Sequence, residues 1–121
     1  MEFTKESLIK LWDVSIMSMS PDVAHEVTET PYISSYSIQL PSFTEEPTLC
    51  NIQAIKMNGE AAKLSIVIGS YIEYHSVELT DEEFVSITQR FIEKNDIIEL
   101  EIRQKLVQKA EKNLKILMES I

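Results

Sequence analysis

The chain has 121 residues and a formal net charge of −9, from 20 acidic and 11 basic residues. This length predicts one domain over residues 1–121, large enough to bury a core, and the single cysteine, Cys50, excludes an internal disulfide. No apolar run approaches the roughly 18 residues of a membrane span, and no secretory signal pattern is recognisable, so we expect a cytoplasmic protein without membrane contact.

The acidic charge is concentrated toward the N-terminus, where residues 1–47 hold eight acids against two lysines. Phosphate backbones are bound by basic surfaces, so we expect no direct contact with nucleic acid. The acidity favours either simple solubility or a basic protein partner.

The first predicted element is a helix over residues 4–19. Thr4 is a favourable N-cap residue for it. One face of this helix is apolar and carries Leu8, Ile9, Trp12, Ile16 and Met19. Ser20 and Pro21 end the helix. Because proline suits a first helical position, the same residues could also start a short helix through about Val27.

Three strands are predicted next. Alternating polarity predicts the first over residues 32–40, and a second is predicted over residues 48–57. Asn58-Gly59 then favours a two-residue hairpin turn of type I′. The third strand is predicted to continue from residue 60 to residue 77, with a kink or bulge at Gly69.

A two-residue turn would fix how the second and third strands pair. Met57 would face Glu60, and Leu49 would face Ile68. Side chains alternate between the two faces of a strand, so one buried face is predicted to hold Leu49, Ile55, Leu64, Ile66 and Ile68.

Two helices are predicted to complete the fold. Thr80 and Glu83 form a capping box that opens a helix over residues 81–94. Asn95, which tolerates the left-handed conformation at a helix end, is predicted to interrupt it, and a last helix of roughly 36 Å is predicted over residues 96–121. The sequence therefore predicts an α+β fold: an N-terminal helix, a three-stranded antiparallel meander and two C-terminal helices, the last one long and amphipathic.

The last predicted helix carries a continuous apolar stripe with a coiled-coil-like seam that Arg103 interrupts. Ile98, Ile102 and Ile116 lie on another side and would need a second contact. The alternative is that Ile98 and Ile102 pack on the preceding helix and Ile116 is a single exposed apolar residue. We expect a homodimer or another protein partner on this helix. The residues assigned to partner binding are Ile98, Ile102, Val107, Leu114, Leu117 and Ile121, with Glu26, Glu29, Glu45 and Glu46 from the acidic N-terminal part.

Little of the chain suggests catalytic chemistry. Two glycines cannot build a phosphate-binding loop, and two distant histidines with one cysteine lack zinc-ligand spacing, so we expect no cofactor and no metal. Tyr71, Glu73 and His75 alternate along the third predicted strand and would share one face. A histidine oriented by a glutamate is the core of general-base chemistry, although no nucleophile accompanies this pair.

The sequence therefore predicts a non-catalytic protein-interaction module: an adaptor, a chaperone or an inhibitor of a larger protein. A specific version is an acidic inhibitor of the phage-encoded kind, occupying a nucleic-acid-binding groove. The alternative is a small-ligand-binding or enzymatic α+β domain with a pocket lined by Tyr71, Glu73 and His75. That pocket requires the three side chains to face the helices.

Overall fold

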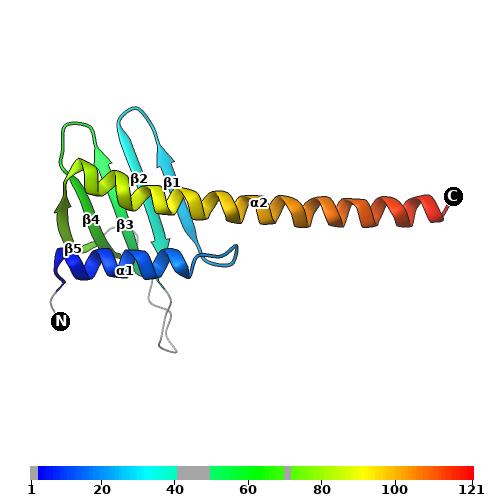
Figure 1. Cartoon of the computed structure of the whole chain (residues 1–121), viewed down its shortest axis with the longest axis horizontal. Coiled ribbons are helices and arrows are strands. Elements are labelled where there is room, and N and C mark those ends of the chain that lie inside the picture. The colour runs from blue at the N-terminus through cyan, green and yellow to red at the C-terminus, as the bar shows by residue number, and fades with distance from the viewer. Residues whose placement is uncertain (1–2, 41–49, 70–71) are drawn as a thin grey trace.

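The computed structural model describes residues 3–40, 50–69 and 72–121, within which the chain forms two helices and five strands (Figure 1). The helices are α1 (Lys5–Met17) and α2 (Asp81–Glu119). The strands are β1 (His25–Glu29), β2 (Ile33–Gln39), β3 (Cys50–Met57), β4 (Ala62–Ile68) and β5 (Ile72–Leu79), and they form one antiparallel sheet in chain order. Both helices cover one face of this sheet, and the second half of α2 projects far beyond it (Figure 1).

The α+β class is confirmed, but the prediction of three strands was wrong. The predicted short helix over residues 21–27 is replaced by β1, in which His25 pairs with Ile38 and Glu29 with Ser34. The turn after β1 is closed by Thr30, whose side-chain oxygen accepts hydrogen bonds from the backbone N–H groups of the second and third residues after it. Pairing with β2 therefore outweighs the weak local preference for a helix.

The second extra strand results from a reversal at Gly69. The sequence predicted one long strand through this position, but Gly69 has a φ of +65°, and Ile68 pairs with Ile72 across the reversal. Only glycine adopts this conformation readily. Gly69, which was predicted to kink one long strand, therefore starts the turn between β4 and β5.

The pairing of β3 with β4 differs from the prediction by one residue. Ile55 pairs with Lys63 and Cys50 pairs with Ile68, because the turn after Met57 is longer than two residues. A shift of one residue exchanges the faces of a strand. On β3 the buried face therefore holds Ile52 and Ala54, and Ile55 lies on the opposite face, whereas Leu64 and Ile66 are buried on β4 as predicted. The predicted contact of Leu49 lies outside the described residues.

The predicted interruption of the C-terminal helix at Asn95 was also wrong, because α2 is continuous from Asp81 to Glu119. The Asn95 side-chain oxygen instead lies 3.0 Å from Nε2 of His25, which ties α2 to β1. Three residues later, Ile98 is buried in the core. Both contacts require the helix to keep its phase through this segment, and no glycine or proline opposes it.

The core lies between the sheet and the two helices. Its centre is Trp12, whose indole N–H donates to the carbonyl oxygen of Ile87 at 2.9 Å and whose ring stacks on Phe91 at 5.9 Å. The capping boxes at Thr4 and Thr80 start the two helices that meet here, as the sequence predicted for both caps. The fifteen buried apolar residues are Leu8, Trp12, Ile16, Met19, Tyr36, Ile38, Ile52, Ala54, Ala62, Leu64, Ile66, Leu79, Ile87, Phe91 and Ile98.

Within the described residues, neither helix combines the length and the apolarity that crossing a bilayer requires.

Replacing Trp12 by Phe should lower the free energy of unfolding by about 1–3 kcal/mol, because the change removes the bond to Ile87 and leaves a cavity. Urea titration followed by circular dichroism measures this. Val14→Ala, at a position of the same helix that is 60% exposed, should stay within about 0.5 kcal/mol of the parent. Equal effects of the two changes would contradict the assignment of Trp12 to the core.

Candidate functional site

The candidate site is the part of α2 that extends beyond the rest of the protein. Ile98 is 2% exposed, whereas every residue from 99 to 121 is exposed. At 1.5 Å per residue, this segment is roughly 34 Å long. We call residues 99–121 the arm, and the remaining described residues the body.

The arm leaves the body because the chemistry of one side of α2 changes after Ile98. The side that faces the body carries Ile87, Phe91 and Ile98. At 3.6 residues per turn, the positions that continue this side are Ile102, Lys105, Lys109, Lys112 and Ile116, so three lysines separate the two isoleucines. A lysine side cannot replace an apolar one against a core, so the body contacts end at Ile98.

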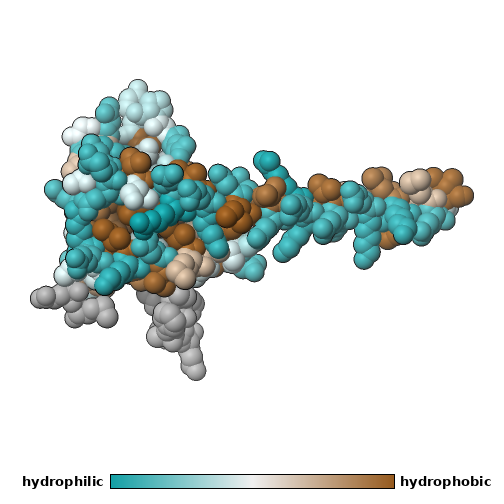
Figure 2. Space-filling model, in the orientation of Figure 1, coloured by the Kyte–Doolittle hydropathy of each residue, from teal (hydrophilic) through white to brown (hydrophobic). Residues whose placement is uncertain are grey.

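A different side of the arm is apolar. Figure 2 shows hydrophobic side chains along one edge of the arm and hydrophilic ones along the other. This apolar stripe consists of Leu100, Leu106, Val107, Ala110, Leu114, Leu117, Met118 and Ile121, and its large side chains are each at least 55% exposed. A contiguous exposed stripe of this extent is typical of a contact surface for another molecule.

Charge is unevenly distributed along α2. Residues 81–101 hold seven acids against two basic residues, whereas residues 103–115 hold five basic residues against one acid, Glu111. The arm is thus an amphipathic helix with a basic middle segment, attached to an acidic body.

The helix residues predicted to bind a partner do not all lie in the same environment. Val107, Leu114, Leu117 and Ile121 lie on the exposed stripe. Ile102 and Ile116 lie on another side, 39% and 54% exposed. Ile98 belongs to the core of its own chain and is not accessible to a partner. It does not pack on a preceding helix, as the sequence alternative proposed, because residues 81–119 form one helix.

The acidic residues predicted to bind a partner do not form one surface among the described residues. Glu26 pairs with Ser37 and Glu29 pairs with Ser34, so their side chains leave β1 on opposite faces of the sheet. Glu29 accepts a hydrogen bond of 2.6 Å from the hydroxyl of Tyr36. Glu45 and Glu46 lie outside the described residues.

The alternative pocket is divided by a β-bulge. Ile66 pairs with His75 while its neighbour Val67 pairs with Glu73, so Glu73 and His75 point to opposite faces of the sheet. The Glu73 carboxylate accepts a hydrogen bond from the Ser65 hydroxyl at 2.9 Å, and hydrogen bonds from Ser65 and Ser76 lower the pKa of Glu73. The His75 ring instead packs on Phe3 at 5.4 Å. Tyr71 lies outside the described residues.

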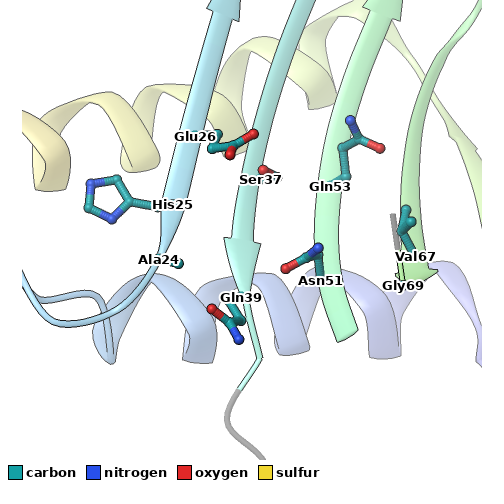
Figure 3. A pocket seen from close by; sticks show the side chains of 9 residues that line it. All are labelled: Ala24, His25, Glu26, Ser37, Gln39, Asn51, Gln53, Val67 and Gly69. Atoms are coloured by element: carbon teal, nitrogen blue, oxygen red, sulfur yellow. The ribbon is translucent and has the colours of Figure 1, made fainter. Parts of the chain in front are cut away.

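The sheet face that the helices leave uncovered is hollowed, a feature that the sequence analysis did not predict. Figure 3 shows polar side chains of β1 to β3 gathered on this face. A hollow of about 350 Å³ lies here, lined by Ala24, His25, Glu26, Ser37, Gln39, Asn51, Gln53, Val67 and Gly69, although the His25 ring itself is directed at Asn95 of α2. Gln53 is already engaged, because its amide donates to the Ser35 hydroxyl at 2.7 Å. The hollow offers hydrogen bonds, but no paired acid and base.

Comparison of the chain with protein-family models, with curated proteins and with solved structures found no match. Among residues 3–40, 50–69 and 72–121, no three His, Cys, Asp or Glu side chains converge in a way that could hold a metal ion. The arm therefore stands as the candidate site on its geometry and chemistry.

Leu114→Asp and Ile98→Asp should have opposite effects on folding, although both place a charge on α2. Burying an unpaired carboxylate costs several kcal/mol, so Ile98→Asp should unfold the body or nearly so. Leu114 is 59% exposed, so Leu114→Asp should keep the cooperative unfolding transition. Trp12 fluorescence during urea titration reports on both variants, and loss of the transition in Leu114→Asp would mean that the stripe is part of a core.

The Tyr36–Glu29 pair predicts an alkaline limit to stability. Burial and, next, the Glu29 carboxylate raise the pKa of Tyr36 from 10.0 to about 12. Between these values the unfolded chain loses a proton that the folded chain keeps, so stability falls as the pH rises from about 10 to about 12. Tyr36→Phe should flatten this fall in urea midpoints, whereas Tyr32→Phe, at a residue 73% exposed, should not. Equal slopes in Tyr36→Phe and the parent would show that Tyr36 does not cause the loss.

Proposed function

We propose that the protein is a non-catalytic protein-interaction module, an adaptor, chaperone or inhibitor, whose arm packs against another protein chain. The observation that carries this proposal is the apolar stripe of the arm, which is exposed over its whole length and rotated away from the body.

The energetics of the arm support this proposal. An isolated helix of this length is only marginally stable in water. Three acid-before-base pairs four residues apart, of which Glu99–Arg103 is the first, add only about 0.2–0.5 kcal/mol each. Complete burial of one leucine side chain is worth about 1.5–3 kcal/mol. A partner on the stripe would therefore stabilise the arm far more than its own sequence does.

The chemistry of the arm favours protein over other partners. Its polar side carries Glu101, Glu111 and Glu119 among the lysines, and a phosphate backbone would repel these three carboxylates. The acidic body, directly adjacent, adds to this repulsion. A stripe of leucine, valine and isoleucine at helical spacing is instead what a helix presents to another helix or to a protein groove.

Hydrogen exchange tests this proposal. The chain is isolated from the cells that produce it, together with the proteins bound to it, and the exchange of its backbone amides is measured. Arm amides should exchange at least about tenfold more slowly than in the double variant Leu114→Asp/Leu117→Asp, while body amides exchange equally in both. Gln108→Asp, on the side of the arm opposite Leu117, is the matched control and should keep the protection.

Two results would overturn the proposal. One is arm exchange that is as fast in the parent as in the double variant. The other is a parent chain that turns over a small molecule or retains one at a fixed ratio, which would favour the ligand-binding alternative.

A further inference from the structure

We infer that the chain packed on the arm is a second copy of this protein, bound antiparallel along α2, so that the arm of each copy lies beside the acidic first half of the other copy's α2. This inference rests on the proposed function and names the partner of that same surface.

Charge distribution along α2 favours this arrangement over a parallel one. In an antiparallel pair that sets Glu99 opposite Arg103, the basic residues 103–115 of one copy lie beside residues 87–99 of the other, which hold three acids against two basic residues, and this happens twice. A parallel pair would instead set acidic segment against acidic segment and Arg103 against Arg103 in the seam. An antiparallel pair therefore avoids the like-charge contacts that a parallel pair would create.

One register sets apolar side chains opposite apolar ones and an acid opposite a base. Val85, Ile92 and Glu99 follow one another at seven-residue intervals, as do Arg103, Ala110 and Leu117. An antiparallel pair centred at position 101 sets the first three residues opposite Leu117, Ala110 and Arg103 of the second copy, in that order. Arg103, which interrupts the apolar seam of a single arm, then meets a carboxylate.

The same register pairs Gln89 with Asn113 of the second copy, two amides that can hydrogen-bond to each other. Leu106 opposite Asp96 is the one mismatched layer.

The side of α2 that this register uses is free on the body. Val85 is 60% exposed and Ile92 is 38% exposed. α1 contacts the other side of α2, through the ion pairs Lys5–Glu83 and Asp13–Arg90. The arm of the second copy would therefore lie next to α2 as a third helix of the layer, with α1 on the far side.

Symmetry gives the remaining apolar side of the arm a contact. The twofold axis of an antiparallel helix pair is perpendicular to both helices, so both sheets lie on the same side of the pair. The side of each arm that continues the body-facing line of α2 then faces the sheet of the other copy. That side carries Ile102 and Ile116 together with Lys105, Lys109 and Lys112, so the two isoleucines outside the main stripe also gain a contact.

Sedimentation equilibrium and cysteine cross-linking of the full chain test the inference. The parent should be a dimer that weakens as salt rises. Leu117→Asp should weaken dimerisation by at least about a hundredfold, because the dimer contains the buried charge twice, whereas Gln108→Asp should leave it unchanged.

In a Cys50→Ser background, the double variant Val85→Cys/Leu117→Cys should form disulfide-linked dimers under mild oxidation. Neither single variant should link. Linking by Leu117→Cys alone, which needs a parallel pair, would overturn the antiparallel arrangement, and so would a double variant that does not link.

A parent chain that stays monomeric at high micromolar concentration would overturn the inference. The hydrogen-exchange experiment then separates the two failures. Protection of the arm by a different protein would rule out the second copy but leave the proposed function in place. Protection by added anionic lipid vesicles would overturn both the second copy and the proposed function. An unprotected arm would overturn both.

Discussion

The structure depends on one line of contacts along α2. Ile87, Phe91 and Ile98 lie on this line, and the hydrogen bond from Trp12 to the carbonyl of Ile87 fixes the helix to the core at the start of the line. The line is continuously apolar only as far as Ile98, because three lysines separate Ile102 from Ile116 beyond it, but the helical hydrogen bonds continue to the last turn. The arm thus exists because a side of one helix changes its chemistry, not because the helix ends.

Local signals predicted the starts of both helices, because an N-cap residue contacts only the first turn of its own helix. The ends of elements depended on distant residues. Asn95 costs a helix only about 0.7 kcal/mol relative to alanine, which burial of Ile98 and the contact with His25 outweigh. β1 was missed for the same reason, since its pairing with β2 outweighs the weak local preference of these residues for a helix.

Periodicity found most of the candidate site, because Val107, Leu114 and Leu117 are where a helical repeat places them. It could not separate Ile98 from them, since that distinction depends on where the body ends. The proposed contact of Glu73 with His75 assumed strict alternation, and the bulge after Ile66 breaks alternation in a way that no short pattern reveals. The hollow on the open face needed β1, and so could not be predicted without it.

The arm also has a consequence for the lifetime of the protein in a cell. A helix without a partner frays, and frayed segments with exposed apolar side chains are the preferred substrates of proteases. Cleavage there would leave the body intact, because every core residue lies at or before Ile98. Uncovered chains would thus lose their arms while covered chains keep them, so degradation would sort the population by assembly.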